Sequence, residues 1–258
     1  MDGTFYLGDR LVEGALHFME VLQRQGRRFL FLTNNSSKNR VQYAKKITDL
    51  GFPVAEEQIF TSGEATALFL QKIKPGARLY VVGTQALEEE FRKHGFELVQ
   101  ENPEYVVLGF DTGFTYQKLW KLCDHVRQGV PYIATHADLN CPVENGQMPD
   151  AGAVMAFVRA STGREPDTVI GKPNRWILEA AVEKMNLPVE ALGMVGDRLY
   201  TDIALGQTCG IATVLVLSGE TKLEDVEQSP YQPDAIFDTI GGLAEWLEEH
   251  DAPWYDPD

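Results

Sequence analysis

The sequence predicts an α/β protein with mainly parallel sheets, in which one α/β module is inserted into another. Short apolar runs alternate with segments of helical periodicity along the whole chain, an order typical of parallel strands joined by helices. Loop-forming residues interrupt this alternation twice, at Lys74-Pro75-Gly76 and at Thr162-Gly163-Arg164-Glu165-Pro166. Because proline and glycine are strong breaks in local structure, the two interruptions favour an inserted module.

Each predicted strand is a short run of mostly apolar residues, as expected for strands that are buried on both faces. These runs cover residues 28–32, 59–61, 79–82, 105–108, 132–134, 169–170, 192–195, 212–217 and 235–237. Each predicted helix carries apolar residues every three or four positions. These segments are 15–22, 41–51, 64–72, 86–94, 119–126, 151–160, 176–185, a helix that starts near residue 202, and 243–247.

Polar segments between these elements are predicted as loops. The segment 136–150 is rich in Asp, Asn, Pro and Gly, and residues 220–233 form a second polar loop. Ser36 or Ser37 is expected to cap the helix that follows. His125 is expected on a helix surface, and residues 252–258, which contain two prolines, are expected to form a loose tail.

The composition is that of an ordinary globular protein of 258 residues, and its charge excludes some classes of partner. The net charge of −15 repels nucleic acid and anionic lipid, so neither nucleic acid nor a membrane is expected as the main partner. No apolar run approaches the ~18 residues of a transmembrane helix, and no signal peptide is visible. Cys123, Cys141 and Cys209 form no CxxC pair, which favours unpaired thiols and a cytoplasmic location, with Cys123 in the core.

Polar side chains stand just past the ends of three predicted strands, at Thr33, Lys172 and Asp197. In an open parallel sheet such positions meet at one edge, where the sites of α/β proteins lie. Asp197 is the best candidate for a Mg²⁺ ligand, because Mg²⁺ prefers oxygen ligands. The alternative for Asp197 is a helix cap, a role for which Asp202 is better placed.

Three of the polar residues suit a phosphate group. Lys172 follows a strand and precedes a proline-started helix, so it can point at a phosphate at the sheet edge, although a lone lysine is usually solvated surface. Thr33 and Asn34 offer a hydroxyl, an amide and backbone N–H groups before a helix, which is a ready anion site. The alternative for these two residues is a polar turn. Taken together, the polar residues predict a site for magnesium and phosphate.

Four short motifs resemble those of the haloacid dehalogenase (HAD) superfamily. In chain order they are Asp2-Gly3-Thr4-Phe5-Tyr6, Thr33-Asn34-Asn35, Gly171-Lys172-Pro173, and Gly196-Asp197 with Thr201-Asp202. Their order and spacing resemble the NagD-like subfamily, the IIA group with 4-nitrophenylphosphatase-type members. The stretch from His136-Ala137-Asp138 to Gly171-Lys172-Pro173 resembles that subfamily closely, and the likeness covers nearly the whole chain.

The resemblance implies a Rossmann-like parallel-sheet core with an inserted α/β cap domain of the C2 type. The core would comprise residues 1–75 and 168–258, and the cap would comprise residues 76–167. The resemblance also implies Mg²⁺-dependent hydrolysis of small phosphate monoesters through an aspartyl-phosphate, a covalent route that divides one hard displacement into two. The partner would be a small phosphorylated metabolite, and a homodimer is a further expectation, because cap-to-cap dimers occur among relatives.

The same resemblance assigns the metal and the proton transfers to three aspartates. Asp2 would act as general acid and base, protonating the leaving alcohol and then activating water. Its backbone carbonyl would also ligate Mg²⁺, beside the carboxylate of Asp197. Asp202 is expected either to support this metal site or to cap a helix.

Five further residues would bind the substrate. The resemblance implies that Lys172 pairs with the nucleophile and the phosphate, while Thr33 and Asn34 position the transferring group. His136 and Asp138 lie in the long loop of the predicted cap and would meet the leaving group. The alternative for these two residues is a solvated loop.

The first motif departs from the family's pattern, which is Asp-x-Asp-Gly-Thr with the nucleophile two residues before the acid/base. Here Asp2 fills the second aspartate position and Met1 the position between them. The nucleophile and the central strand that carries it would therefore precede Met1. A sheet without its central strand leaves backbone groups unpaired, so we expect a shortened chain; the alternative is a folded but catalytically inactive protein.

The main alternative to a phosphatase is a non-catalytic HAD-fold protein that binds a metal or a phosphorylated ligand, or that serves as an interaction module. Release of phosphate would separate the two. A dinucleotide-binding oxidoreductase of the same fold class has no support. No G-x-G-x-x-G motif follows a first strand, and Gly193 and Gly196 are not spaced for one.

Overall fold

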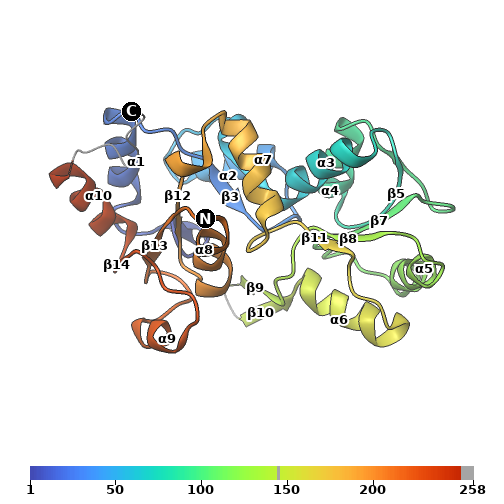
Figure 1. Cartoon of the computed structure of the whole chain (residues 1–258). Helices are drawn as coiled ribbons and strands as arrows, with labels where there is room; N and C mark the ends of the chain where they lie inside the picture. Colours follow the sequence, from blue (N-terminus) through green and yellow to red (C-terminus); the bar gives the residue numbers. More distant parts are fainter. Residues whose placement is uncertain (144–145, 251–258) are drawn as a thin grey trace. The chain divides into compact units, whose positions relative to one another are not determined.

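The computed structural model describes residues 1–143 and 146–250 (Figure 1). The chain divides into two compact units. The first unit contains Met1–Phe31, Ala44–Gln58 and the described chain from Lys172 onward, and the second contains Leu32–Tyr43 and Ile59–Gly171. The second unit therefore holds the segment predicted as the cap together with residues 32–43, 59–75 and 168–171, which the sequence assigns to the core.

The second unit is built on a five-stranded parallel sheet. Its strands, in the order β11-β8-β7-β5-β6, are β11 (Thr168–Val169), β8 (Tyr132–Ala134), β7 (Tyr105–Leu108), β5 (Arg78–Val82) and β6 (Glu97–Leu98). The chain passes from β5 to β6 on one side, and β7, β8 and β11 follow on the other side. Because crossovers between parallel strands are right-handed, this reversal places helices on both faces of the sheet.

The helices of the second unit occupy these two faces (Figure 1). On one face α3 (Ser62–Ile73) packs with α4 (Gln85–Lys93), and on the other α5 (Tyr116–Arg127) packs with α6 (Ala151–Thr162). The observed arrangement confirms the prediction of an α/β fold with a parallel sheet.

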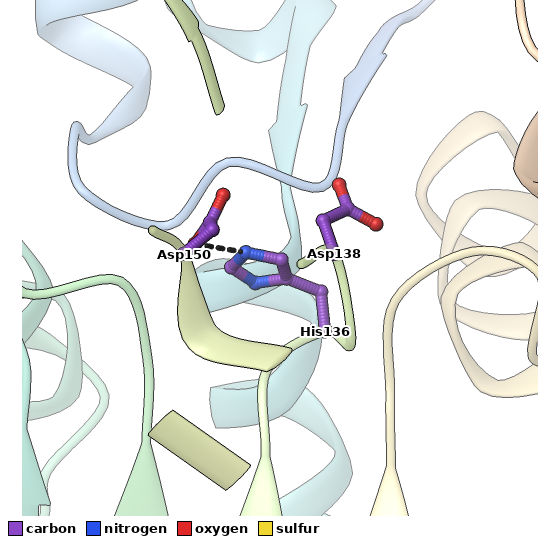
Figure 2. A group of neighbouring side chains, drawn as sticks. All are labelled: His136, Asp138 and Asp150. Atoms are coloured by element: carbon purple, nitrogen blue, oxygen red, sulfur yellow. Dashed lines mark hydrogen bonds and ion pairs between the residues drawn. The ribbon is translucent and has the colours of Figure 1, made fainter. Parts of the chain in front are cut away.

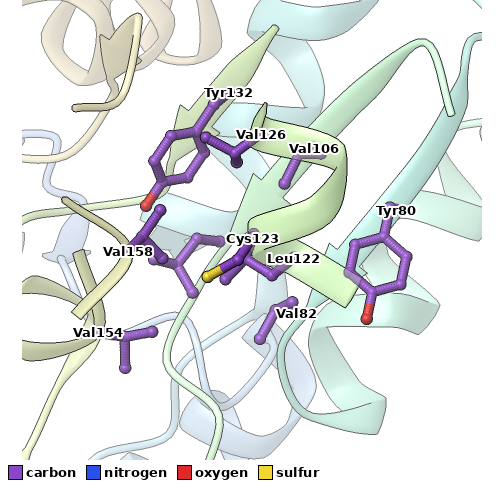
Figure 3. Packing of buried hydrophobic residues seen from close by; sticks show 10 residues of the cluster. Tyr80, Val82, Val106, Leu122, Cys123, Val126, Tyr132, Val154 and Val158 are labelled. Carbon is purple, nitrogen blue, oxygen red and sulfur yellow. The ribbon is translucent and has the colours of Figure 1, made fainter. Parts of the chain in front are cut away.

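The core on the α5–α6 face is formed by side chains from three strands and two helices (Figure 3). Cys123 lies in this cluster and is buried, as the sequence predicts. The expectation that His125 lies on a helix surface is wrong. His125 is buried, its ring packs edge-on against Tyr80 with centroids 5.0 Å apart, and its Nε2 lies 3.1 Å from the Gln100 carbonyl oxygen.

The first unit contains a parallel three-stranded sheet of β12 (Gly193–Gly196), β13 (Ala212–Val216) and β14 (Ala235–Phe237), with β13 in the middle. Its helices include α1 (Ala15–Arg24), α7 (Arg175–Met185), α8 (Ala204–Cys209), α9 (Leu223–Gln228) and α10 (Ile240–Glu249). Helix α1 packs on α10, so the beginning and the end of this unit are joined. A small hairpin of β1 (Tyr6–Leu7) and β2 (Arg10–Leu11) follows the first residues.

The predicted strand 28–32 is shorter and shifted, because only Phe31–Thr33 (β3) is a strand; it pairs with β4 (Ile59–Thr61). Apolar residues of this run also pack in the core of the first unit. Phe29 and Phe31 join Phe5 and Phe52 in an aromatic cluster, in which the rings of Phe5 and Phe31 are 4.9 Å apart.

Neither Ser36 nor Ser37 caps the following helix, α2 (Arg40–Asp49). Asn39 does so instead: the Gln42 N–H donates to Asn39 Oδ1 (3.1 Å), and the Asn39 N–H donates to Gln42 Oε1 (3.0 Å). This reciprocal pair satisfies backbone N–H groups at the helix start, as in a capping box.

Both predicted loops contain regular structure. Residues 136–150 include a hairpin of β9 (Asn140–Val143) and β10 (Gly146–Pro149), and residues 220–233 include α9. The hairpin strands are largely exposed and carry no apolar alternation, so no hydrophobic pattern marks them. The predicted tail at 252–258 lies outside the described residues.

Helices α3, α5 and α6, each 12 residues long, fall short of the ~20 residues that span a bilayer, and among residues 1–143 and 146–250 no helix is long and apolar enough to do so.

Candidate active site

Asp197 directly follows β12, and the chain encloses its carboxylate closely. Thr4 Oγ1 donates to Asp197 Oδ1 at 3.1 Å, and the Glu220 N–H donates to Oδ2 at 3.0 Å. A Cβ atom at Gly3 would lie 2.2 Å from Oδ2, and one at Gly219 would lie 2.1 Å from it. The buried carboxylate is therefore held in one position, and only glycine fits at these two neighbours.

Asp202 and Lys172 form a buried ion pair in the same unit. Lys172 Nζ lies 2.6 Å from Asp202 Oδ1, and the Arg198 N–H donates to Oδ2 at 3.2 Å. Asp202 stands in a short π-helix, Leu199–Ile203, which leads into α8. Its carboxylate thus accepts hydrogen bonds both from Lys172 and from the backbone N–H of Arg198, the residue that precedes the π-helix.

The charges of this cluster shift one another's pKa. Burial by itself would raise the pKa of Asp202, but the charge and hydrogen bond of Lys172, together with the positive charges of the Met1 amino group and Arg198, outweigh burial and lower it. Burial raises the pKa of Asp197, and the negative charge of Asp202 adds to this. The amino group of Met1 lies near these residues, and burial, followed by the charge of Lys172, lowers its pKa. The ionised form is therefore favoured at Asp202 and disfavoured at Asp197.

The residues at Asp197 fit a divalent cation. Lys172 compensates the charge of Asp202, whereas the hydrogen bonds to Asp197 come from two neutral groups, a hydroxyl and a backbone N–H. A cation here would offset the burial and the repulsion that raise the pKa of Asp197. Carboxylate oxygens are the donors that Mg²⁺ prefers.

In the second unit, Thr33 and Asn34 begin a segment that hydrogen bonds hold in place. Asn34 is buried, and its Nδ2 donates to Asp138 Oδ1 at 3.0 Å. Ser62 Oγ donates to the Asn34 carbonyl, and the Asn35 N–H donates to Thr33 Oγ1 at 3.2 Å. Asn34 and Asp138, predicted to act from the core and from the cap, are thus in direct contact.

His136, Asp138 and Asp150 form a cluster in the second unit (Figure 2). Each offers a nitrogen or a carboxylate oxygen, and these atoms all lie within 4.8 Å of one another. His136 is fully buried; its Nε2 lies 2.9 Å from Asp150 Oδ1, and its Nδ1 lies 2.8 Å from Thr135 Oγ1. Both ring nitrogens therefore have hydrogen-bond partners inside the protein.

The predicted site residues fall into two groups, one in each unit. The first unit brings together Lys172, Asp197 and Asp202, and it also contains Asp2, which is exposed and bridges to Tyr6. The second unit contains Thr33, Asn34, His136 and Asp138.

Sequence reasoning missed Asp150, although a signal was present. Asp150 immediately precedes a helical apolar pattern, which is the position of an N-cap. In the structure it is the N-cap of α6, and its Oδ1 accepts the Ala151 N–H at 2.6 Å.

Two family models match the chain. A model described as haloacid dehalogenase-like hydrolase matches residues 1–97, and one described as HAD-hydrolase-like matches residues 169–243. The 5'-nucleotidase YutF of Bacillus subtilis (strain 168) is 36% identical over 247 residues, which cover 96% of this chain and 95% of the relative.

Solved structures agree with these matches. The 4-nitrophenylphosphatase from Thermotoga maritima superposes with a TM-score of 0.93 at 46% identity, covering 95% of this chain and 94% of that chain. NagD from E. coli K-12 superposes with a TM-score of 0.87 at 34% identity, covering 93% and 94%. The resemblance of the four motifs is confirmed, and the chain belongs to the haloacid dehalogenase-like hydrolases, in the group of NagD-like and 4-nitrophenylphosphatase-type phosphatases.

Proposed function

We propose that the protein hydrolyses small phosphate monoesters in a Mg²⁺-dependent reaction that passes through an aspartyl-phosphate. The observation that carries this proposal is the buried cluster of Asp197, Asp202 and Lys172 at the carboxyl end of β12. It combines a carboxylate suited to a divalent cation with a lysine suited to a phosphate. Two of the matching proteins are a 5'-nucleotidase and a 4-nitrophenylphosphatase, which supports the same reaction class.

In this proposal Asp197 and the backbone carbonyl of Asp2 hold Mg²⁺, and Asp202 supports the site by orienting Lys172. The ion, when bound, neutralises negative charge on the transferring phosphoryl group. Lys172 pairs with a phosphate oxygen and with the nucleophile. Asp2 gives its proton to the leaving alkoxide and, as a carboxylate, later takes a proton from the water that attacks the phosphoenzyme.

The nucleophilic carboxylate in this proposal is the first aspartate of the family's motif, which in this numbering stands one position before Met1. It forms a new bond to phosphorus while the ester P–O bond breaks. Thr33 and Asn34 position the phosphoryl group, and Asp138 of the 136–150 loop meets the leaving group. We further propose that residues 76–167 act as a cap over a core, that the protein is a homodimer, and that it is cytoplasmic.

The test is phosphate release from 4-nitrophenyl phosphate and from nucleoside 5'-monophosphates, with Mg²⁺ or with EDTA. It compares this chain with one extended upstream by a strand ending in Asp-Met-Asp. We expect release by the extended chain only, its loss with EDTA, and a loss of at least about a hundredfold in Asp197→Asn. The exposed Asp238→Asn is the matched control in the same unit.

Two results would count against the proposal. Release that persists in EDTA would contradict the role of Mg²⁺. Mg²⁺-dependent binding of inorganic phosphate without release from either chain would instead favour the non-catalytic binding protein.

A further inference from the structure

We propose that Asp150 is a positioning residue, which holds the phosphate-binding segment 33–37 and the loop bearing Asp138 through a buried chain of hydrogen-bonded side chains. The chain runs from Asp150 through His136 and Thr135 to Ser36. The inference rests on the proposed function, because it assigns these residues to the support of Asn34 and Asp138 at a phosphate site.

The chain is continuous and buried. Asp150 Oδ1 lies 2.9 Å from His136 Nε2, and His136 Nδ1 lies 2.8 Å from Thr135 Oγ1. Thr135 Oγ1 lies 3.0 Å from Ser36 Oγ, which accepts the Phe110 N–H at 2.9 Å. The four residues whose side chains form this series are each at most 3% exposed, so water does not compete for their hydrogen bonds.

The groups that Asp150 and Ser36 offer at the two ends of the series set which partner donates in each hydrogen bond. An ionised Asp150 only accepts, so His136 carries a proton on Nε2, and in the neutral imidazole that we propose Nδ1 is then an acceptor. Thr135 must then donate to Nδ1. Ser36, which accepts the Phe110 N–H, donates its own proton to Thr135 Oγ1. One neutral tautomer of His136 thus gives every side chain of the series its hydrogen bonds. A change at Asp150 therefore alters the hydrogen bonds as far as Ser36.

The segment 33–37 and the loop bearing Asp138 are both connected to these hydrogen-bonded side chains. Ser36 lies in the segment with Asn34, whose Nδ2 donates to Asp138 Oδ1 at 3.0 Å. The first turn of α6, which Asp150 caps, also binds the second loop, because the Gly152 N–H donates to the Asp138 carbonyl at 2.9 Å. Asp150 therefore acts on His136 through its side chain and on the Asp138 loop through the helix that it begins.

The packing beside the chain leaves little room for adjustment. A Cβ atom at Gly171 would lie 2.7 Å from Asn34 Oδ1, 2.8 Å from His136 Cβ and 2.9 Å from the Thr135 carbonyl oxygen. The backbone at Gly171 thus packs directly against Asn34 and against His136 and Thr135, the two middle residues of the hydrogen-bonded chain. A shift of His136 would be passed on to Asn34 by contact as well as by hydrogen bonding.

Two other uses of these residues fit less well. A Thr–His–Asp nucleophile would have to reach a substrate, but Thr135 and His136 are fully buried. A metal centre of His136, Asp138 and Asp150 would compete with existing bonds, because Asp150 Oδ1 already accepts from His136 and from the Ala151 N–H.

The first test is the imidazole N–H of His136, observed by ¹⁵N-edited NMR of the protein labelled at histidine and assigned with His136→Gln. We expect a protected proton on Nε2 in the wild type. Asp150→Asn keeps an acceptor oxygen in the same place and should keep this signal. Asp150→Ser preserves a helix cap but is too short to reach His136, so the signal should be lost. Added Zn²⁺ should leave the wild-type signal unchanged.

The second test is affinity for inorganic phosphate in the presence of Mg²⁺, with kcat/KM measured where the protein releases phosphate. We expect Asp150→Ser to lose about tenfold or more in both, and Asp150→Asn to stay near the wild type. Thr115→Ala is the matched control, because Thr115 caps α5 in the same unit without touching the chain. It should change neither the His136 signal nor the affinity for phosphate.

Thr135→Val, which keeps the shape of the side chain and leaves the cap of α6 intact, is the second variant if Asp150→Ser does not fold. It should show the same loss of affinity. The proposal is overturned by a wild-type proton on Nδ1, by a signal that Zn²⁺ abolishes, or by wild-type affinity in Asp150→Ser or Thr135→Val. Absence of phosphate release from every form would refute the proposed function, while the NMR result would still decide whether the hydrogen-bond chain exists.

Discussion

At Asp197 two neighbouring glycines, Gly3 and Gly219, limit where the carboxylate can lie. A Cβ atom at Gly219 would stand 2.1 Å from Asp197 Oδ2, so Gly219→Ala must displace either the carboxylate or the loop. We expect the affinity for Mg²⁺, measured by calorimetry, to fall by about tenfold or more.

The control for this substitution is Gly242→Ala in the same unit, where the new Cβ would make only an ordinary contact, 3.4 Å from Phe237. Gly242 lies in α10, so alanine should raise the free energy of unfolding by up to about 1 kcal/mol. Unchanged Mg²⁺ affinity in Gly219→Ala would show that Asp197 is not a ligand, or that the loop containing Gly219 moves to admit the new Cβ atom without displacing Asp197.

Glu90 predicts a pH dependence of stability. Burial raises the pKa of Glu90, and the nearby Glu64 carboxylate adds to this. The folded state therefore disfavours the ionised form, and stability is lost as pH rises from the unfolded pKa of about 4.3 through the higher folded pKa. Glu90→Gln does not titrate, so it should be more stable than the wild type at pH 8 and equal to it near pH 4.

Urea unfolding of both proteins at the two pH values measures this difference. Half-buried Glu89→Gln in the same helix, α4, is the control, because Glu89 is less buried than Glu90, and it should show a smaller dependence. A Glu90→Gln variant that is less stable at pH 8 would mean that the ionised Glu90 is stabilised by His94, whose Nδ1 lies 3.4 Å from it.

At the scale of elements, two helix caps of the second unit differ in burial. Thr61 Oγ1 accepts the Glu64 N–H at 3.1 Å in a buried position, while Thr115 Oγ1 accepts the Lys118 N–H at 3.2 Å in an exposed one. Water can replace the cap only at Thr115. Thr61→Ala should therefore cost about 2 kcal/mol or more and Thr115→Ala about 0.5–1 kcal/mol, measured by denaturant unfolding. Equal losses would contradict this account.

The elements differ in how well their own residues predict them. Strands such as β5, β7 and β13 are buried apolar runs, and the sequence predicts them to within a residue or two. Strands β9 and β10 and helix α9 carry weak local signals, because most of their side chains face solvent. Their structure depends on neighbours, as in the bond from the Asp150 N–H to the Leu139 carbonyl at 2.9 Å.

At the scale of the whole molecule, the net charge of −15 predicts an effect of salt on anionic substrates. Repulsion extends over a Debye length of about 30 Å at 0.01 M salt but only about 8 Å at 0.15 M. At saturating Mg²⁺, kcat/KM for a phosphate monoester should therefore rise severalfold over this range. The rise should be equal in NaCl and KCl, and a fall would mean that local positive charge dominates the approach of the substrate.

The sequence by itself determined the alternation of strands and helices, the family, and the placement of Asp197 just past a strand, because hydrophobic period and short motifs are local properties. Only the tertiary structure decided which side chains meet. Lys172 reaches Asp202 across 30 positions, and His136 reaches Asp150 across 14. The residue types allow many partners for each of these charges. Packing and burial select one, because a buried polar group must find its hydrogen bonds inside the protein.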